Sequence, residues 1–543
     1  MKLRLTITSG SLNGREFDLQ TGFLTVGRGE NCSIRFDPLS ERIASKQHAF
    51  IEARPDGFFI TDNQSTNGTF VNEQPIESVK LHDGDEVRFG KNGVTARVAF
   101  DQASNGPLSD ITHDRPDQTS ADHWEQAASR PVTIQGSLSQ LGLGSVASVA
   151  PKPAPVGKYI GIGVTILAII FLSLIVGLIM FASLGPVAAI IAAIVAFVPA
   201  MIYLLPFMFL DRYDPEPLWL LALAFAWGAL VAVLVSIVIN TIVTLVAAIA
   251  AMIGGLPPEL GEVVGAVISA PIVEEGSKGV GLLILLIFFR RYFDDILDGI
   301  VFAGVIALGF ATVENVMYYG RGLNGGGIYG LLLLFGLRGI LSPFAHATFT
   351  SMTGIGCGIS RESHKSVVRF VMPVVGYIFA MSLHMLWNAM AFLSVFAIEA
   401  TGLTSTCGYI GLGGPGEVPL CGFIFGYGLL EVPLFFIFVI FALLIMRRQN
   451  RILKDMLAID VARGVIPEDH AKTATSAFRS ISWLLGGLFS GKLFARSRYL
   501  RAMGKLGLSY WHIQRATAAQ GQTGSFQQNP ILREQVVSLR DKV

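Results

Sequence analysis

Long apolar stretches between Tyr159 and Met446 constrain this chain more than any other feature. Each is near 20 residues or longer, the length that an α-helix needs to cross a hydrocarbon layer about 30 Å thick. The chain has 52% hydrophobic and only 15% charged residues, which excludes an ordinary soluble enzyme. We predict about eight transmembrane helices, at 159–182, 187–210, 218–245, 263–289, 299–319, 327–357, 370–398 and 422–446.

The charges that flank these stretches predict their orientation. An even number of spans places both termini on one side of the membrane, and with both termini inside, ten basic residues lie on that side. They are Arg212, Arg290, Arg291, Arg361, Lys365, Arg369, Arg447, Arg448, Arg451 and Lys454. The outside loops hold only Arg321. The positive-inside rule therefore predicts cytoplasmic termini, and no early apolar segment resembles a secretory signal.

The rest of the chain divides by composition. Residues 1–100 hold 12 Lys and Arg and 13 Asp and Glu in short alternating runs broken by Gly, Asn and Asp, which is typical of a small β-sandwich. Residues 101–157 are rich in Ser, Gly, Gln, Pro and Asp, and we interpret them as a disordered linker. We therefore predict a multidomain chain, with an all-β sandwich, this linker, an all-α polytopic membrane domain at 158–446 and a helical tail at 447–543.

The tail is basic. It contains 16 Lys and Arg against 6 Asp and Glu. Such a charge is compatible with nucleic-acid binding, but in a segment that follows a membrane span it favours attraction to anionic lipid. We expect the lipid bilayer as a partner and no nucleic acid.

Four cysteines are too few for a disulfide scaffold. Cys407 and Cys421 both fall in a loop that the topology places outside, where an oxidising environment permits a disulfide between them. The alternative is two free thiols in this Gly-rich loop.

Several short motifs in the first 100 residues point to phosphate recognition. They are Gly27-Arg28, Ser45-Lys46-Gln47-His48, the run from Asp62 to Asn72 with Ser65-Thr66-Asn67-Gly68-Thr69 inside it, and Asp83-Gly84-Asp85. In this order and spacing they resemble the forkhead-associated (FHA) domain over residues 3–99. Members of that family are β-sandwiches whose loops bind phosphothreonine peptides.

The residue types also fit this chemistry, because a phosphate dianion needs a charged fork and small hydroxyl or amide donors on loops held by a rigid scaffold. The resemblance implies that Arg28, Ser45, Lys46 and Thr66 contact the phosphate and that Asn67 holds the peptide backbone. Gly27 and His48 look structural in this pattern. The alternative is a sandwich that has kept its loops and lost binding.

Ionisable groups inside a bilayer are costly, and each one is a functional candidate. The predicted spans hold a set of them, namely Glu274, Glu275, Lys278, Glu314, Arg338, His346 and His384, and the polar amides Asn315 and Asn388 accompany them. Residues four apart share a helix face, which pairs Glu274 with Lys278 and His384 with Asn388. Two adjacent carboxylates in a low dielectric cannot both stay charged cheaply, which suits one of them to act as a general base. The alternative is a polar cluster that only ties helices together.

Four motifs in this region resemble the PrsW group of intramembrane proteases, which belongs with the CAAX prenyl endopeptidases. They are Glu274-Glu275-x-x-Lys278, Phe310-x-x-x-Glu314-Asn315, His346-x-x-Phe349 and His384-x-x-Trp387-Asn388. The loop from Asp211 to Pro217 also looks like that of PrsW proteins. The resemblance covers residues 186–400 and implies hydrolysis of a peptide bond within or beside a membrane, with a prokaryotic plasma membrane as the natural setting.

The resemblance also implies roles for the catalytic candidates. Glu274 or Glu275 would activate a water, while His346, His384 and Asn388 would hold the water, bind a metal or stabilise the oxyanion. Two histidines and a carboxylate would suit zinc, whereas the prenyl endopeptidases favour a mechanism without an obligatory metal, so zinc is only a candidate cofactor. Glu314 stands where more distant relatives often have His, and we assign it a supporting role or a metal ligand.

Two classes of function follow. The first is an intramembrane endopeptidase that is recruited or regulated by phosphothreonine binding and that cleaves a membrane-associated protein. The second is a non-catalytic receptor or scaffold for phosphothreonine-marked partners. The complete set of motif residues favours the protease, and the absence of an obvious inverted repeat argues against a transporter.

Overall fold

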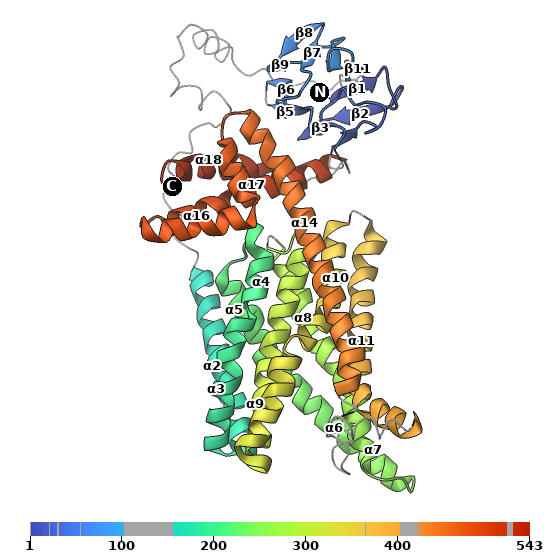
Figure 1. Cartoon of the computed structure of the whole chain (residues 1–543), viewed down its shortest axis with the longest axis vertical. Coiled ribbons are helices and arrows are strands. Elements are labelled where there is room, and N and C mark those ends of the chain that lie inside the picture. The colour runs from blue at the N-terminus through green and yellow to red at the C-terminus, as the bar shows by residue number, and fades with distance from the viewer. Residues whose placement is uncertain are drawn as a thin grey trace, which may run out of the picture. The chain divides into compact units, whose positions relative to one another are not determined.

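The computed structural model in Figure 1 describes most of the chain. The described residues are 2–20, 22–29, 32–54, 56–101, 156–290, 292–363, 365–401, 421, 424–518 and 525–543. Almost all of the predicted linker lies outside them. The chain forms two compact units, one made of residues 1–162 with 452–543 and the other of residues 163–451.

The first unit begins with a β-sandwich, coloured blue in Figure 1. Its strands are β1 (Lys2–Ile7), β2 (Glu16–Leu19), β3 (Phe23–Gly27), β4 (Ile34–Arg35), β5 (Ala49–Arg54), β6 (Gly57–Asp62), β7 (Thr69–Val71), β8 (Gln74–Ile76), β9 (Ser78–Lys80), β10 (Glu86–Phe89) and β11 (Val94–Asp101). One sheet has the order β2-β1-β11-β10-β7-β8 and the other β4-β3-β5-β6-β9. Alternate side chains such as Leu3, Leu5 and Ile7 of β1 are fully buried between the sheets. The sandwich predicted from the sequence is confirmed.

The C-terminal segment of this unit is helical. It comprises the end of α14 (Val432–Ala462) with α15 (Glu468–Ala474), α16 (Ala477–Phe489), α17 (Leu493–Ala518) and α18 (Ser525–Arg540). Helix α17 packs on the outer face of strand β3. The ring of Phe23 meets Tyr510 edge to face at 5.5 Å, and Gln514 donates to the hydroxyls of Thr25 and Ser33 at 3.0 and 3.1 Å.

Strand β3 is consequently buried on both faces. Leu24 and Val26 point into the sandwich core, whereas Phe23 and Thr25 are covered from outside. A strand at the surface of an isolated sandwich alternates buried and exposed residues. In this chain the C-terminal helices therefore complete the fold of the N-terminal sandwich.

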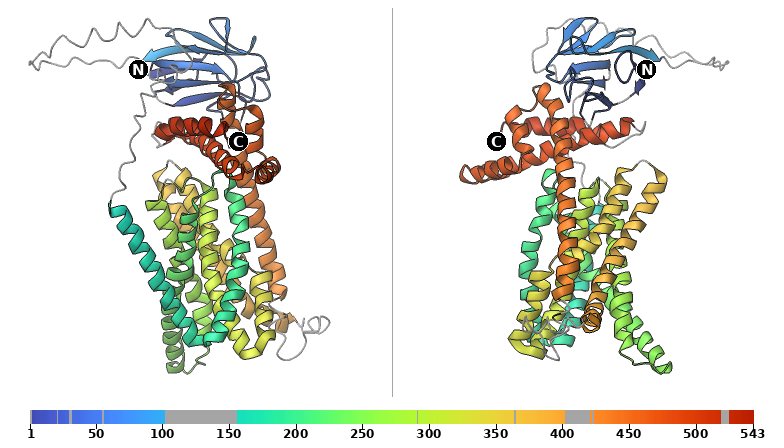
Figure 2. Two further views of the ribbon diagram at one scale, coloured as in Figure 1. Left: turned by 90° about the vertical axis from the view of Figure 1, so that its left-hand side faces the viewer. Right: turned by 45° about the vertical axis from the view of Figure 1, so that its right-hand side comes forward.

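The second unit is a bundle of helices, seen from two sides in Figure 2. In chain order they are α2 (Val156–Leu184), α3 (Pro186–Tyr203), α4 (Leu205–Leu210), η2 (Asp211–Tyr213), α5 (Leu218–Ala226), η3 (Trp227–Ala232), α6 (Val233–Ile253), α7 (Leu260–Val264), η4 (Gly265–Ser269), α8 (Ala270–Phe288), α9 (Ile296–Leu334), η5 (Phe335–Leu341), α10 (Ala345–Glu362), α11 (Ser366–Thr401), η6 (Tyr427–Glu431) and the first part of α14.

Six helical segments among the described residues are long and apolar enough to cross a membrane. They are 161–184, 186–213, 218–253, 296–362, 366–390 and 424–462. The fourth covers two of the spans predicted from the sequence. Helix α8, which carries Glu274, Glu275 and Lys278, is not among the six, because three charges make it less apolar. A helical membrane protein is confirmed, and the total of eight spans stays a prediction.

Helix α9 and its continuation form the centre of the bundle. Of the most apolar window of 296–362, 94% is buried, whereas the corresponding windows of the other five segments are 11–28% buried. Close packing against α10 depends on Gly299, since a Cβ there would lie 2.1 Å from the carbonyl oxygen of Gly354. A central helix surrounded by others is the place where polar side chains can be shielded from lipid.

The predicted span 327–357 is not one straight helix. Gly327 has φ +60°, a left-handed conformation that favours glycine, and the chain doubles back there so that Gly322 and Gly330 approach closely. The chain then continues through the π-helical turn η5 and a break before α10 begins at Ala345. This break separates Arg338 from His346, which the sequence placed on one helix.

Candidate functional site

The side chain of Glu275 is the most fully bonded carboxylate of the polar cluster. It projects from α8 and is fully buried. Its Oε1 lies 2.8 Å from Nζ of Lys278 and 3.0 Å from Nδ1 of His384, and its Oε2 accepts a hydrogen bond of 2.7 Å from Thr350. Both oxygens are therefore engaged, on one side by a cation and on the other by a hydroxyl.

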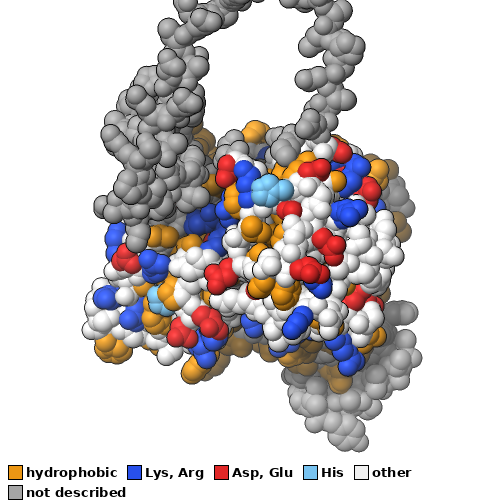
Figure 3. All heavy atoms as spheres, turned by 90° about the horizontal axis from the view of Figure 1, so that it is seen from above, with side chains coloured by type: hydrophobic (Ala, Val, Ile, Leu, Met, Phe, Trp, Pro, Cys, Tyr) orange, Lys and Arg blue, Asp and Glu red, His pale blue; other side chains and the backbone are white. Residues whose placement is uncertain are grey.

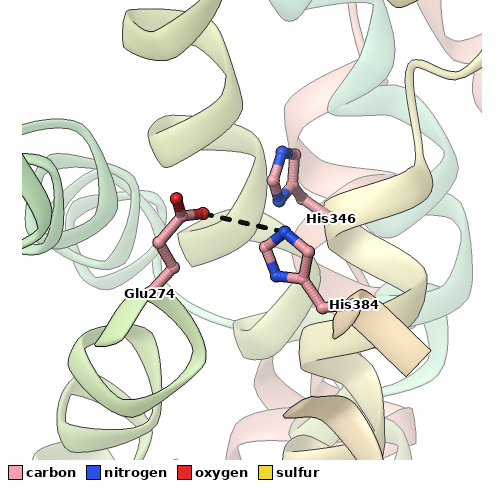
Figure 4. Close-up of side chains that lie close together, drawn as sticks. All are labelled: Glu274, His346 and His384. Atoms are coloured by element: carbon pink, nitrogen blue, oxygen red, sulfur yellow. Dashed lines mark ion pairs between the residues drawn. The ribbon is translucent and has the colours of Figure 1, made fainter. Parts of the chain in front are cut away.

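The neighbouring Glu274 has a different environment. Its Oε2 is buried and finds no hydrogen-bond donor among the described residues. The nearest charged or ionisable atoms are Nζ of Lys278 at 3.6 Å and Nε2 of His384 at 3.9 Å. Figure 4 shows this carboxylate facing the rings of His384 and His346, which come from different helices. One carboxylate oxygen of Glu274 thus faces two imidazoles.

His346 is held by a second carboxylate. Its Nε2 lies 2.9 Å from Oε2 of Glu314 on α9. The same Glu314 oxygen accepts a 2.7 Å hydrogen bond from Nη2 of Arg338, whose Nε donates to Asn315 at 2.7 Å. The other ring nitrogen, Nδ1, lies 3.3 Å from Nζ of Lys278. Each histidine therefore has one nitrogen against a carboxylate and the other turned toward the centre of the cluster.

This arrangement has the residues of a metal site. Glu274, His346 and His384 each offer one ligand atom, and the three atoms lie within 4.8 Å of one another. A metal-ligating histidine usually gives its other ring nitrogen to a carboxylate, as His384 does to Glu275 and His346 to Glu314. Two imidazoles and a carboxylate are ligands typical of zinc in hydrolases.

Asn388 lies one helical turn after His384 on α11, as the spacing predicted. Its amide donates a 2.8 Å hydrogen bond to the backbone carbonyl of Ala266 in η4. This hydrogen bond holds α11 against η4. From the sequence we expected the Asn388 amide to contact the reacting groups instead.

Sequence reasoning missed Thr350 and left Arg338 open. Thr350 follows His346 by one helical turn, which is the signal that could have found it. Arg338 lies 24 residues after Glu314, and nothing in the local sequence pairs the two. The described structure brings both into the cluster, Thr350 through Glu275 and Arg338 through Glu314.

The five predicted phosphothreonine-binding residues gather at one end of the sandwich. Arg28 follows β3, Ser45 and Lys46 precede β5, and Thr66 and Asn67 lie between β6 and β7. The loops are joined by hydrogen bonds. The backbone N–H of Thr66 donates to the Ser45 hydroxyl at 3.0 Å.

Two more contacts fix the same loops. Nε of Arg28 donates to the carbonyl of Ala44, and the amide of Asn67 donates to the carbonyl of Ile43 at 2.7 Å. Lys46, Thr66 and Asn67 are exposed. The loops thus present a guanidinium, an ammonium, hydroxyls and an amide at one end of a rigid sandwich, which is the chemistry that a phosphate dianion requires.

His48 supports these loops from inside. It is fully buried, its Nδ1 accepts from the N–H of Ser45 at 2.9 Å, and its Nε2 lies 3.1 Å from the carbonyl of Gly68. The ring is therefore neutral with its proton on Nε2. Burial lowers the pKa of His48 below the usual histidine value. The structural role expected for His48 fits these contacts.

The cysteines divide into two kinds. Cys32 and Cys357 are buried free thiols. Cys421 is disulfide-bonded, whereas Cys407, its predicted partner, lies outside the described residues.

Two protein families match this chain. Residues 216–411 match the family described as PrsW family intramembrane metalloprotease. Residues 24–90 match the FHA domain. Both resemblances found from the motifs are thereby confirmed.

Curated relatives include three proteins of Mycobacterium tuberculosis. The ABC transporter ATP-binding/permease protein Rv1747 is 40% identical over 15% of this chain and 9% of its own length. The FHA domain-containing protein FhaA is 35% identical over 17% of each chain. The glycogen accumulation regulator GarA is 33% identical over 16% of this chain and 52% of its own. The chain thus spans about half or less of the length of these relatives.

Solved structures give similar matches. One comes from a study titled structural and functional analysis of phosphothreonine-dependent FHA domain interactions, with 30% identity over 19% of this chain and all of that chain, at a TM-score of 0.17. Another is the FhaA FHA domain complexed with the intracellular domain of Rv3910, with 31% identity over 18% of this chain and 98% of that chain, at a TM-score of 0.16.

Proposed function

We propose that this chain, in which an FHA domain precedes a PrsW-family intramembrane protease domain, cleaves a membrane-associated protein and is recruited or regulated through phosphothreonine. The observation that carries the proposal is the difference between two adjacent carboxylates. Both oxygens of Glu275 are bonded, whereas Oε2 of Glu274 is buried, lacks a donor among the described residues and faces two histidines. Buried polar atoms without a hydrogen-bond partner are a minority in folded proteins, and such an oxygen that faces two histidines favours a reactive role over one that only joins helices.

Glu274 acts in this proposal as the general base. Its Oε2 accepts a proton from a water molecule while the water oxygen adds to the carbonyl carbon of the scissile peptide bond. When the carbon–nitrogen bond breaks, the same proton passes to the leaving amine. His384 and His346 face the place where the reacting groups meet and orient them.

The other charged residues position this constellation. Glu275 fixes the ring of His384, Thr350 fixes Glu275, and Glu314 with Arg338 fixes the ring of His346. Lys278, which is fully buried, is ion-paired with both carboxylates on α8. Such supporting contacts hold reacting groups in place without rearrangement during the reaction.

The site fits a divalent cation such as zinc. Glu274, His346 and His384 would hold it. The cation would satisfy the unbonded Oε2 of Glu274, and with the metal bound Glu274 would be a ligand and no longer the general base. A bound zinc would polarise the substrate carbonyl and lower the pKa of water. We assign the metal to these three residues, with Glu275 and Glu314 orienting the two histidines.

The FHA domain supplies recruitment in this proposal. Arg28, Ser45, Lys46 and Thr66 would bind the phosphate of a phosphothreonine-containing protein, and Asn67 its backbone. Attachment of a partner to the same chain raises its effective concentration at the protease without any new contact at the active site. We place the protein in a prokaryotic plasma membrane, with several spans and both termini in the cytoplasm.

A comparison of new protein N-termini tests the proposal. Membranes from cells with the wild-type chain are compared with membranes from cells with Glu274→Gln at matched expression, and Glu262→Gln, an exposed glutamate of α7, serves as the control. We expect termini that disappear in Glu274→Gln and persist in Glu262→Gln. Identical profiles in all three strains, with threonine kinases active, would favour the scaffold function instead.

A further inference from the structure

Helix α16 carries its apolar side chains on the outside. Five large apolar residues of this helix are between 50% and 89% exposed. They are Phe478, Ile481, Leu485, Leu488 and Phe489. At 3.6 residues per turn they fall within an arc of about 100°. We call this set the α16 stripe.

The opposite face of α16 explains why the stripe points outward. Trp483 packs against Tyr499 of α17 with ring centroids 6.2 Å apart, and the guanidinium of Arg496 lies 4.9 Å from the Trp483 ring centroid and donates to the Trp483 carbonyl at 2.6 Å. Gly487 is buried against Leu493 and Arg496. The helix is therefore anchored through a small aromatic and cationic face, whereas an amphipathic helix of a soluble domain buries its wide apolar face.

Scattered exposed apolar side chains need no explanation. The face of the molecule in Figure 3 has this ordinary character, with acidic, basic and apolar side chains interspersed. The α16 stripe differs because its five members are contiguous on one helix. A contiguous apolar patch of this kind marks an interaction surface.

The charges around the stripe indicate what it contacts. Between Asp469 and Glu534 the chain has nine Lys and Arg and no Asp or Glu. Exposed basic residues lie in α16, in the turn after it and in the first turns of α17, namely Arg479, Lys492, Arg498 and Arg501. An apolar stripe flanked by basic residues fits an anionic lipid surface, where the apolar side chains enter the acyl boundary and the cations meet the headgroups.

We propose that α16 is an interfacial helix, which inserts the α16 stripe into an anionic lipid leaflet. The chain already contains membrane spans, so the helix is never far from a bilayer and needs only modest intrinsic affinity to dock. The proposal does not depend on the protease activity. Neither does it depend on phosphothreonine binding.

The test uses the full chain in lipid nanodiscs of phosphatidylcholine, with or without phosphatidylglycerol. A Leu485→Cys variant carries an environment-sensitive fluorophore, and a Ser538→Cys variant, exposed on α18, is the matched control. Background labelling is low because Cys32 and Cys357 are buried, and burial raises the pKa of Cys32 to about 12. The parent chain without an introduced cysteine, treated with the same fluorophore, measures the remaining background labelling.

We expect the Leu485→Cys label to be quenched by lipids that carry a nitroxide on the acyl chain, more strongly with phosphatidylglycerol, and the Ser538→Cys label to be quenched only by aqueous iodide. A Phe489→Cys label should behave like Leu485→Cys, which guards against misfolding of one variant. Replacement of Arg498 or Arg501 by Gln should lower the ratio of docked to free helix about fivefold per charge.

Three outcomes would overturn the proposal. The first is equal iodide quenching at positions 485 and 538 with no effect of the lipid nitroxide. In the second, the Leu485→Cys label is shielded only when a nanodisc holds two chains, which assigns the stripe to a second copy. In the third, the label responds to added duplex DNA and not to lipid, which assigns the basic segment to nucleic acid.

Discussion

Nδ1 of His384 lies 3.0 Å from Oε1 of Glu275, although the two residues are 109 positions apart in the chain. This contact turns the other nitrogen of the ring toward Glu274. The adjacent glutamates of α8 thereby acquire different tasks, since one is a fixed acceptor and the other keeps a carboxylate oxygen for chemistry.

The two glutamates should respond differently to substitution. Glu274→Gln removes the proposed base and should lower cleavage by about 10² to 10⁴-fold with little change in thermal stability. Glu275→Gln leaves Lys278 without its closest ion pair and should also lower the unfolding free energy, by about 3–5 kcal/mol. Peptide-bond cleavage and thermal unfolding of the same purified proteins measure both effects. Equal loss of stability in the two variants would contradict the division of roles.

A metal held by Glu274, His346 and His384 should be measurable without any activity assay. We expect about one zinc ion per purified wild-type chain, a much lower content in His384→Ala, and loss of activity on chelation that added zinc reverses. Elemental analysis gives the content, with His470→Ala in the C-terminal segment as the control. A wild-type chain that is free of metal and fully active in chelator would assign catalysis to Glu274 and the histidines alone.

Removal of Arg28 should abolish the strongest phosphate contact. Arg28→Ala removes hydrogen bonds to a charged group, each of which contributes about 1.5–3 kcal/mol. Loss of one such bond should lower the affinity for a phosphothreonine peptide about 10- to 150-fold. Calorimetric titration of the full chain measures the change. Arg15→Ala, an exposed arginine in the turn before β2, removes the same charge and should keep wild-type affinity; comparable losses in the two variants would argue for a general charge effect.

The buried His48 predicts acid sensitivity of the FHA domain. Burial lowers the pKa of His48 in the folded state, so the unfolded state binds the proton more readily, and stability is present above the unfolded pKa of about 6.5 and is lost as the pH falls below it. The slope for one proton is at most about 1.4 kcal/mol per pH unit. Protonation of Nδ1 also removes the acceptor for the Ser45 N–H.

Hydrogen-exchange protection of β5 and β6 amides at different pH values measures this effect. The protection should fall below pH 6.5 in the wild-type chain and in His82→Asn, since His82 is exposed. A His48→Asn variant should lose this part of the dependence. If the wild-type and His48→Asn curves are parallel, other groups are responsible.

The helices after residue 452 should protect the sandwich. Arg463 pairs with Glu52 of β5 and with Asp460, and its guanidinium lies 4.9 Å from the Phe50 ring centroid. Arg463→Met leaves these carboxylates without this cation, which should cost about 3–5 kcal/mol and speed exchange of β3 and β5 amides by about 100-fold or more. Hydrogen exchange of the full chain measures it, with exposed Arg501→Met as the control. Unchanged protection in Arg463→Met would show that the sandwich is stable without these helices.

Local patterns in the sequence were sufficient for much of this protein. Apolar runs of membrane length, alternating residues in the first 100 positions and motif spacing predicted the all-β sandwich, the helical membrane domain and both families. Each of these properties depends on residues close together in the chain, and it can therefore be predicted from the sequence.

The tertiary structure decided the division of roles at the candidate site. From the sequence, Glu274 and Glu275 were equally good candidates for the general base, and Asn388 was expected to contact the reacting groups. Their partners come from helices 75 to 122 residues away, since Thr350 and His384 bond Glu275 and Ala266 bonds Asn388. Which oxygen remains without a donor depends on how separate helices pack, and no local pattern encodes that.

The same limit applies to the sandwich. The outward residues Phe23 and Phe50 are apolar, but only the fold shows that Tyr510 and Arg463, more than 400 residues later, cover them. The length of an apolar run, the alternation along a strand and the residues of one motif each depend on at most a few tens of neighbouring residues. The identity of a covering helix or of a free carboxylate is fixed only when distant segments compete for the same apolar surface and the same hydrogen bonds.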